Sequence, residues 1–403
     1  MILVLLANVV ALFFSAFVAG VLVGVLLIPS VRRTVADVLS HVAERLRRRP
    51  ALLLARPTGK PILTPRANLW EDQAVLNPAA LDLGGRVHLI YRAIGRDGVS
   101  RFGYASSADG FTFDQILPYP VFAVRNPGGP GAIRRYSPVL YPSGGSWGGA
   151  EDPRMVAING RVYVTFNLFD NWQMRVGYIS LSEEDFLAHR FERWEGPFYI
   201  SGGNQNKSNS PLSSKNRDKN WTLFPEKING EFAVLHTVID EDPNRVRIEY
   251  TDALETLPER EFDTIDPQKV PDQPIAWHIH VRSAGPPPLK TPYGWLVFYH
   301  ASSQDEPHIG YKLGAMLLDL EDPTKILHRA PHPILEPDMP YENTHKAVVY
   351  ACGALVRDDL LFVYYGGGDH IVSVATAPLE EFLQALMRDE APSLATEPLT
   401  RAA

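Results

Sequence analysis

The stretch NGRVYVTFNL at residues 159–168 places an Asn-Gly turn in front of an alternating, aromatic-rich run. This combination is typical of a β-hairpin whose strand buries one face. A turn followed by such a run occurs five times, at Gly85, Gly160, Gly230, Gly294 and Asp359. The turns are 75, 70, 64 and 65 residues apart. A repeat of this length predicts one supersecondary unit that is copied around an axis.

The repeat predicts five all-β units near residues 74–120, 148–196, 220–265, 278–330 and 344–387. From about residue 69 onward, helical periodicity occurs in two short stretches, residues 182–189 and 379–387. A short motif precedes each repeated strand: Asn77-Pro78, Glu151–Arg154, Phe224–Lys227, Gly285–Pro288 and His345-Lys346. Because a ring of such units lines its axis with its innermost strands, polar residues at one place in each unit are expected to converge on a central pocket.

The distribution of charge argues against nucleic acid as a partner. The formal net charge is −7, but residues 1–50 carry a net charge of +4, which leaves −11 on the rest of the chain. An acidic body repels a phosphate backbone. Cys352 is the only cysteine, so a disulfide within the chain is excluded, and this favours a reducing compartment.

The N-terminal segment predicts a membrane anchor. Residues 2–28 contain no charged side chain, and an apolar run of more than about 18 residues is typical of a transmembrane helix. A cleaved signal peptide is the alternative, but it would need a charged start and a shorter apolar core. Arg32, Arg33 and further arginines follow the run, so the positive-inside rule predicts a single-pass protein whose C-terminal part faces the cytoplasm.

The remaining boundaries follow from composition. After an anchor at residues 1–29, residues 30–68 are expected to form a basic amphipathic helix on the membrane surface and a Pro-rich linker, with a short coiled-coil stalk as the alternative to the helix. The catalytic domain is expected at residues 69–388 and a flexible tail at residues 389–403. Ala16, Gly20 and Gly24 form a small-residue stripe that would permit a homo-oligomer.

The motifs also occur in an order that resembles glycoside hydrolase family 130, the mannoside phosphorylases and related mannosidases, over about residues 74–380. The matching segments are Asn77-Pro78, Tyr91–Ala93, Gly103–Gly110, Glu151–Arg154, Leu223–Gly230, Gly294–Leu296, Tyr299-His300, Tyr311–Pro323, Pro333–Leu335, Cys352-Gly353 and Tyr364–Asp369. The resemblance implies a five-bladed β-propeller, in agreement with the five repeats. The expected fold is therefore an all-β, five-bladed β-propeller preceded by the transmembrane helix and the basic amphipathic helix.

The resemblance implies an inverting phosphorolysis of β-mannosides with Asp152 as the general acid. The acid protonates the glycosidic oxygen through a sugar hydroxyl, and inorganic phosphate attacks the anomeric carbon from the opposite face. The product is α-mannose 1-phosphate, and the reaction is reversible. This scheme needs one protein carboxylic acid, because phosphate replaces the water and the base of an inverting hydrolase. No cofactor and no metal are expected, and phosphate is the co-substrate.

The same resemblance assigns the ligands of the substrate and of phosphate. The expected mannoside-binding residues are Asn77, Arg92, Arg154, Asp369 and Tyr299, and the expected phosphate-binding residues are Lys227 and His300. Four of these assignments have a structural alternative. Arg92 could form a plain ion pair, Lys227 could be a surface lysine on a turn, and His300 and Tyr299 could belong to the core.

Departures from the family pattern keep two other functions open. Thr237 follows Leu235-His236 where the family often has an arginine. Loss of phosphate-binding cations would favour an inverting β-mannosidase, in which Glu226 or another acid would be the base. A catalytically silent glycan-binding propeller is a different class of function, and the presence of Asp152, Arg92 and Asp369 argues against it. The linkage and the acceptor stay open, and the substrate is a β-mannoside oligosaccharide or glycolipid.

Overall fold

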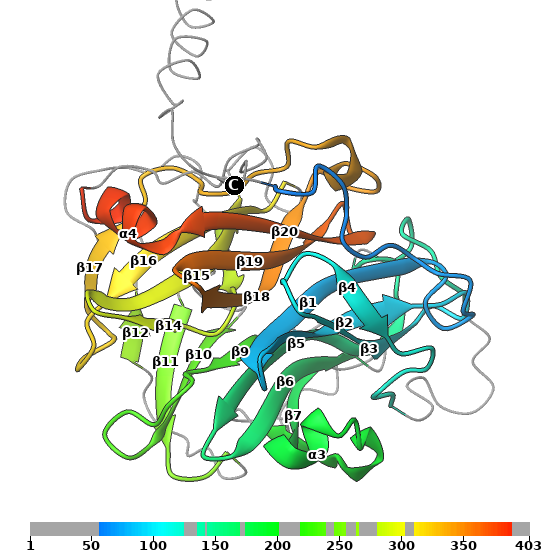
Figure 1. The fold of residues 1–403 in the computed structure, drawn as a ribbon, viewed down its shortest axis with the longest axis horizontal. Coiled ribbons are helices and arrows are strands. Elements are labelled where there is room, and N and C mark those ends of the chain that lie inside the picture. Colours follow the sequence, from blue (N-terminus) through cyan, green and yellow to red (C-terminus); the bar gives the residue numbers. More distant parts are fainter. Residues whose placement is uncertain are drawn as a thin grey trace, which may run out of the picture. The chain divides into compact units, whose positions relative to one another are not determined.

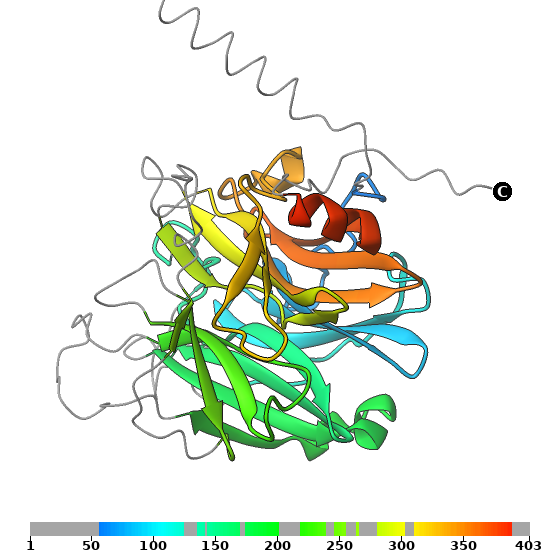
Figure 2. The ribbon, with the colours of Figure 1, turned by 90° about the vertical axis from the view of Figure 1, so that its left-hand side faces the viewer.

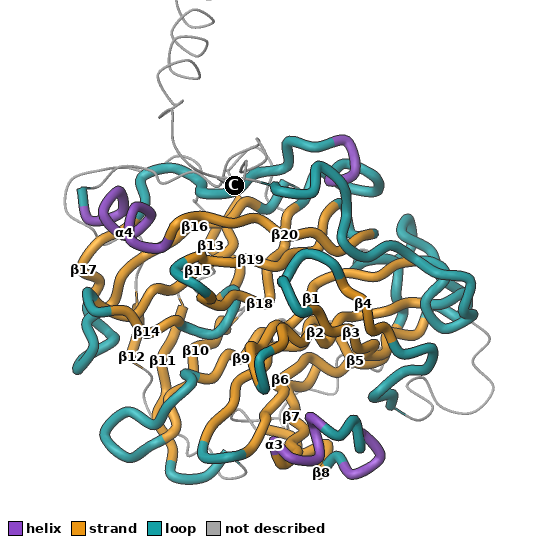
Figure 3. The backbone as a smooth tube through the Cα atoms, viewed as in Figure 1, coloured by secondary structure: helices purple, strands orange, loops and turns teal. Residues whose placement is uncertain are grey.

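The structure, a computed structural model, describes residues 56–124, 135–141, 143–169, 174–200, 218–238, 246–254, 263–265, 280–302 and 310–388. All of them belong to one compact unit that spans residues 53–403. Strands dominate this unit, as Figure 3 shows. Its described helical elements are the α-helices α3 (Glu183–Leu187) and α4 (Leu379–Met387) and the 3₁₀ turns η1 (Phe191–Arg193) and η3 (Pro340–Glu342). Both α-helices lie where the helical periodicity predicts them.

The strands form five antiparallel units in chain order (Figure 1). The first unit contains β1 (Ala74–Leu83), β2 (Arg86–Ile94), β3 (Val99–Ser107) and β4 (Phe113–Ile116). The second contains β5 (Gly148–Ile158), β6 (Arg161–Phe169), β7 (Met174–Ser182) and β8 (Glu195–Ile200). A short parallel contact at Val99 and Gly148 joins β3 to β5, so these two units share one sheet.

The other three units continue the pattern. The third contains β9 (Asp218–Leu223), β10 (Phe232–Val238), β11 (Val246–Thr251) and β12 (Asp263–Ile265). The fourth contains β13 (His280–Ala284), β14 (Leu289–Thr291), β15 (Gly294–Ser302), β16 (Lys312–Leu318) and β17 (Ile326–Arg329). The fifth contains β18 (Val349–Arg357), β19 (Leu360–Gly367) and β20 (Ile371–Pro378). The predicted turns at Asn159-Gly160 and Asn229-Gly230 have positive φ at all four residues, as a two-residue hairpin turn requires.

A hydrophobic core lies between each pair of neighbouring units, because successive side chains of a strand point to opposite faces. On β15, Trp295 and Val297 join the core shared with the third unit, whereas Leu296 and Phe298 join the core shared with the fifth. Similar cores join the first unit to the second and the second to the third. The fifth unit shares a core with the first. The five units therefore close into a five-bladed β-propeller, and each is called a blade below.

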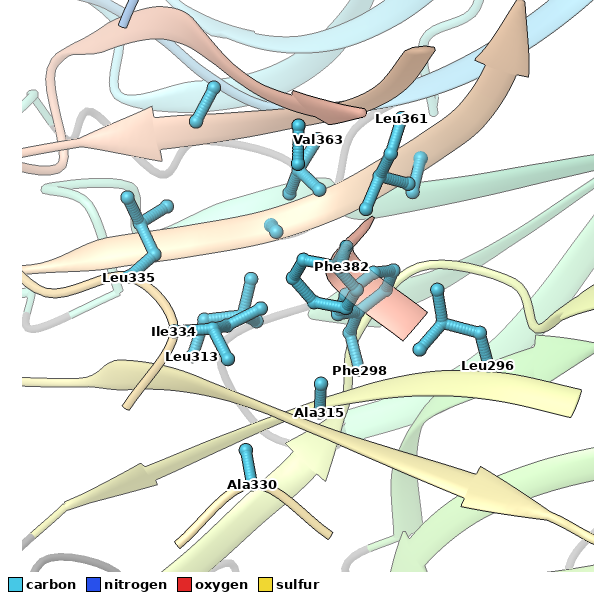
Figure 4. Close-up of a cluster of buried hydrophobic side chains, with 14 of the residues drawn as sticks. Leu296, Phe298, Leu313, Ala315, Ala330, Ile334, Leu335, Leu361, Val363 and Phe382 are labelled. Atoms are coloured by element: carbon cyan, nitrogen blue, oxygen red, sulfur yellow. The ribbon is translucent and has the colours of Figure 1, made fainter. Parts of the chain in front are cut away.

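Helix α4 completes the core between the fourth and fifth blades. Figure 4 shows Phe382 of α4 between Phe298 of β15 and Leu361 of β19. The Phe382 and Phe298 rings lie 6.3 Å apart in an edge-to-face arrangement, which suits the quadrupoles of two aromatic rings. Figure 2 shows the same helix, in red, lying beside the strands of the fifth blade.

The innermost strand of each blade contains one extra residue. In β1, β5 and β9, two residues oppose one on the next strand, and these pairs are Asn77-Pro78, Asp152-Pro153 and Asn220-Trp221. In β13 and β18 the inserted residues are Arg282 and Cys352. A bulge of this kind changes the direction of a side chain and is frequent beside active sites. Since β1 contacts both β18 and β5, and β9 contacts both β5 and β13, the bulges surround the centre of the ring.

The predicted transmembrane helix in front of the propeller is not supported, and the expected fold is wrong in that part. Among the described residues no helix is long and apolar enough to cross a membrane. The longer α-helix, α4, has 9 residues, and a crossing needs about 20. Residues 2–28 and the basic segment that follows them lie outside the described residues. The cytoplasmic location and the boundaries at residues 29, 68 and 388 stay predictions.

Candidate active site

Two bulges place an amide and a carboxylate side by side at the centre of the ring. Asn77 and Asp152 have φ values of 49° and 51°, a left-handed conformation that residues other than glycine adopt rarely. Nδ2 of Asn77 donates to Oδ1 of Asp152 at 2.7 Å. The predicted sugar ligand and the predicted general acid therefore meet, although they come from different blades.

Arg92 of β2 links this pair to Glu151. Its Nη1 donates to Oδ1 of Asp152 at 3.2 Å, and its Nη2 donates to Oε1 of Glu151 at 2.8 Å. Ser143 accepts from Arg92 through its backbone carbonyl at 2.9 Å and donates its hydroxyl to Oε2 of Glu151 at 2.9 Å. Arg92 is only 1% exposed, so its charge has to be balanced by these carboxylates. Arg92 thus both pairs with acids and orients Asp152.

The two neighbouring carboxyl groups differ in their pKa. Burial raises the pKa of Glu151, and the charge of Asp152 raises it further against the effect of Arg92. Burial acts in the same direction on Asp152, but Arg92, the Asn77 amide, Arg154 and Lys219 together hold the pKa of Asp152 below its usual value. In the unliganded site Asp152 is therefore ionised at neutral pH.

Asp369 lies at the turn between β19 and β20, at the edge of the same cluster. It has a φ of 54°, and its Oδ2 lies 3.6 Å from Nζ of Lys346. Burial raises the pKa of Asp369, with Lys346 and Arg92 opposing the shift and Asp152 adding to it. Arg92 and Asp152 are thus near enough to influence the pKa of Asp369, and these three residues are all predicted site residues.

Arg154 and His300 also lie near Asp152, and each makes hydrogen bonds with the backbone and a side-chain contact with Tyr350. Arg154 donates to three carbonyl oxygens, one of which belongs to Asp152. Nε2 of His300 accepts the Ala351 N–H at 2.9 Å, and its ring stacks on Tyr350 at a centroid distance of 3.9 Å. Burial lowers the pKa of His300 to about 3, so the imidazole is neutral. A neutral His300 brings no positive charge to the site.

The structure does not bring Tyr299 and Lys227 into this cluster. Tyr299 is fully buried in the core between the third and fourth blades, as the alternation of β15 requires. Lys227 lies in the β9–β10 hairpin connection, at the end of the blade away from the bulge at Asn220. Its Nζ sits 4.4 Å from the centre of the Phe232 ring. The Phe224–Lys227 motif thus lies after the innermost strand of the third blade, and the role of Lys227 in phosphate binding stays a prediction.

Lys219 and Asn220 are further candidate site residues, and the sequence analysis missed them. Lys219 pairs with Thr237 just before the bulge of β9, as Glu151 pairs with Asn167 just before the bulge of β5. Asn220 has a φ of 62°, and its Nδ2 is buried without a hydrogen-bond partner among the described residues. The signal was present in the sequence, because Leu-Asn-Pro, Glu-Asp-Pro and Lys-Asn-Trp stand at equivalent places in three blades.

The cluster holds Asp152 together with the carboxyl groups of Glu151 and Asp369, the cation of Arg92 and the amide of Asn77. No group of His, Cys, Asp and Glu side chains in the described ranges could hold a metal ion. This arrangement suits an enzyme that cleaves a glycosidic bond by protonating the leaving group next to a bound anion.

Comparison with known proteins then identifies the family. The profile of the family described as β-1,4-mannooligosaccharide phosphorylase matches residues 46–388. The chain belongs to this family, glycoside hydrolase family 130, and the predicted resemblance is confirmed. As a member it is a glycoside phosphorylase or glycosidase, as predicted.

Two relatives come from a Thermoanaerobacter species. The chain is 35% identical to its 1,2-β-oligomannan phosphorylase over 338 residues, which is 81% of this chain and 98% of the relative. It is 29% identical to the β-1,2-mannobiose phosphorylase of the same organism, with the same coverage of both chains. The solved β-1,2-mannobiose phosphorylase of Listeria innocua has a TM-score of 0.60 at 22% identity, with 84% of this chain and 97% of that chain covered. This likeness supports the fold.

Proposed function

We propose that this enzyme phosphorolyses β-1,2-linked manno-oligosaccharides, with Asp152 as the general acid. Family membership and the curated relatives confirm the predicted reaction class, the phosphorolysis of a β-mannoside. The β-1,2 linkage is the finer proposal. It is supported by two relatives, which are a 1,2-β-oligomannan phosphorylase and a β-1,2-mannobiose phosphorylase.

The position of Lys219 is the observation that favours a phosphorylase over a hydrolase. An inverting hydrolase needs a second carboxylate that activates water across the sugar from the acid. The third blade instead brings a cation near Asp152, and the buried amide of Asn220 adds a donor beside it. Glu226, the base expected for a hydrolase, lies in the β9–β10 connection and pairs with the surface residue Lys290. Lys219 and Asn220 are therefore our candidate phosphate ligands, in place of Lys227.

The chemical step follows from this placement. An oxygen of hydrogen phosphate forms a bond to the anomeric carbon while the bond from that carbon to the leaving oxygen breaks. The Asp152 carboxyl supplies the proton that the leaving oxygen receives through a sugar hydroxyl. The phosphate proton is then released, and Asp152 is reprotonated. Asn77, Arg92 and Asp369 hold the mannosyl ring, and the cations stabilise the charge of the incoming phosphate.

Asp152 has to gain a proton before it can act, although its pKa is low in the unliganded site. Bound sugar removes water from the carboxyl group, and phosphate adds a negative charge nearby. Both changes raise the pKa of a carboxyl group. Substrate binding thus favours the protonated form that the reaction needs.

The test incubates the full-length protein with β-1,2- and β-1,4-mannobiose, with and without phosphate, and assays mannose 1-phosphate and free mannose. We expect phosphate-dependent mannose 1-phosphate from the β-1,2 substrate. The Asp152→Asn variant should lose on the order of 10²–10⁴ of the rate, the usual contribution of a general acid. Free mannose at a rate independent of phosphate would show a mannosidase, and a preference for β-1,4-mannobiose would contradict the proposed linkage.

A further inference from the structure

Arg154 directs three hydrogen bonds at the backbone, and it also makes a side-chain hydrogen bond with Tyr350. Its Nε donates to the Gly285 carbonyl at 2.9 Å, its Nη2 to the Ala284 carbonyl at 3.1 Å and its Nη1 to the Asp152 carbonyl at 2.9 Å. Arg154 is only 2% exposed. A guanidinium has five N–H donors in a rigid plane, so three fixed acceptors determine its position.

These contacts connect blades that are not neighbours along the ring. Arg154 belongs to the second blade, and the acceptors Ala284 and Gly285 belong to the fourth. The hydroxyl of Thr222, in the third blade, lies 3.4 Å from the same Gly285 carbonyl. A side chain at position 285 would place its Cβ 3.0 Å from the Phe298 carbonyl oxygen. Glycine therefore allows the backbone at residue 285 to lie close to the backbone at Phe298.

The third acceptor is the peptide carbonyl of Asp152 itself. Asp152 adopts a left-handed backbone at the bulge of β5, and its carboxyl direction depends on that peptide. A single cation therefore joins the backbone of the acid to the opposite side of the ring.

We propose that Arg154 is a positioning residue, which acts through Asp152 by fixing its peptide against the backbone at residues 284–285. Arg154 then has no direct part in binding sugar or phosphate. This inference rests on the proposed role of Asp152 as the acid. Errors of about 1 Å in the placement of a catalytic group reduce rates by about 100-fold, which sets the size of the expected effect.

The test compares two substrates that differ in their need for an acid. β-1,2-Mannobiose has a sugar leaving group that must be protonated, whereas the 2,4-dinitrophenolate of an activated aryl β-mannoside leaves without a proton. Arg154→Lys keeps the charge but cannot reach three separated carbonyls. We expect it to lower kcat on mannobiose by about 100-fold and kcat on the aryl mannoside by less than about 3-fold. Asp152→Asn provides the reference pattern of an enzyme without its acid.

Equal losses on both substrates would overturn the proposal, because Arg154 would then contact the sugar or the nucleophile. Unchanged activity on both substrates would overturn it as well. So would an Asp152→Asn variant that loses activity equally on both, since Arg154 would have no acid to position. Arg161→Lys is the matched control, because Arg161 is in the same blade, is partly exposed and pairs with Glu195.

If Arg154→Lys does not fold, Gly285→Ala tests the same connection from the other side. Its methyl group would press on the Phe298 carbonyl and shift the acceptor of Arg154 without changing a charge. The expected result is again a selective loss on mannobiose, and an equal loss on both substrates contradicts the proposal. The ratio of the two losses in kcat, on mannobiose and on the aryl mannoside, does not depend on whether phosphate or water is the nucleophile. If the wild-type enzyme releases free mannose, the proposed phosphorolysis fails. This outcome is separate from a failure of the positioning role of Arg154.

Discussion

Left-handed backbone conformations mark the residues that carry the site. Asn77, Asp152 and Asp369 have φ values of 49°, 51° and 54°, and Asn220 has a φ of 62°. Such conformations cost roughly 1 kcal/mol or more, and Asn and Asp tolerate them better than most residues. The surrounding pairing has to hold them, and in β1, β5 and β9 the bulge does so. A search for Asn or Asp at equivalent places in each repeat would have found Asn220.

The two candidate phosphate-binding lysines can be separated by a matched pair of variants. We expect Lys219→Met to raise the KM for phosphate at least about 10-fold, since a charge-assisted contact contributes about 1.5–3 kcal/mol. Lys227→Met removes a lysine from a hairpin connection and should leave this KM unchanged. Steady-state kinetics at varied phosphate measures both. A raised KM for phosphate in Lys227→Met, with no change in Lys219→Met, would indicate that Lys227 binds phosphate.

His300 is expected to make stability depend on pH. Its folded pKa is about 3 against an ordinary value of 6.5, so between these values the unfolded chain binds a proton that the folded chain does not. The free energy of unfolding therefore falls as pH falls through this window. From pH 7 to pH 5 the wild type should lose about 2 kcal/mol more than His300→Gln, which keeps an acceptor but does not titrate. Urea unfolding at both pH values measures this, and equal losses would contradict a neutral buried His300.

The bulged inner strands are the elements that turn a regular sheet into a site. Gly353 in β18 shows how closely they pack, because a Cβ at this position would lie 2.6 Å from the Ala80 nitrogen and 2.7 Å from the Pro78 carbonyl oxygen. The fifth blade thus lies directly against the bulge that holds Asn77. Glycine is required here by space, since backbone atoms cannot move aside as a flexible side chain can.

Gly353→Ala should therefore affect both stability and the sugar site. We expect a loss of about 1–3 kcal/mol in the free energy of unfolding, as for other insertions into a packed core. Displacement of Pro78 should also raise the KM for the mannoside. Gly230→Asn is the control, because Gly230 lies in an open turn and Asn accepts its positive φ of 88°. Unchanged stability and kinetics in Gly353→Ala would contradict this packing.

At the scale of the whole propeller, the segment before β1 closes the ring. Leu63 pairs with Val372 of β20, so residues from the start of the propeller extend the last blade. Arg56 donates to both carboxylate oxygens of Glu342 at 2.8 and 2.9 Å, and the Tyr365 hydroxyl donates to Oε1 of Glu342 at 2.6 Å. The ion pair is buried, with Arg56 3% and Glu342 0% exposed. The ring is thus held between residues nearly 300 positions apart.

Removal of Arg56 should destabilise the molecule strongly. Arg56→Met leaves the carboxylate of Glu342 buried without its cation, and such a change costs about 3–5 kcal/mol. The control Arg86→Met breaks an ion pair with Asp114 in which the two side chains are 28% and 55% exposed, and it should cost at most about 1 kcal/mol. Thermal and urea unfolding of both variants test this. Similar losses would show that the buried pair does not close the ring.

Local patterns in the sequence were sufficient for the blades and for part of the site. The Asn-Gly turns, the alternation and the short helices lie where they were predicted, because each depends on residues close in the chain. The positions of Asn77, Arg92, Asp152 and Asp369 followed from family motifs, and the structure brings them together. The transmembrane part of the expected fold was wrong. Lys227 and Tyr299 lie outside the cluster, since the position of a motif within its blade and the direction of a buried side chain depend on register.

The sequence by itself determined the repeating unit and its number, because turn residues and alternation are local properties, whereas the role of Asp152 was an expectation drawn from the family resemblance. Only the tertiary structure decided which side chains share the centre. The charge of Lys219 lowers the pKa of Asp152, and Arg154 binds the backbone at residues 284–285, because bulges in separate strands meet when the blades close into a ring. A contact between distant segments depends on register and ring closure, and neither is visible in any one stretch of the chain.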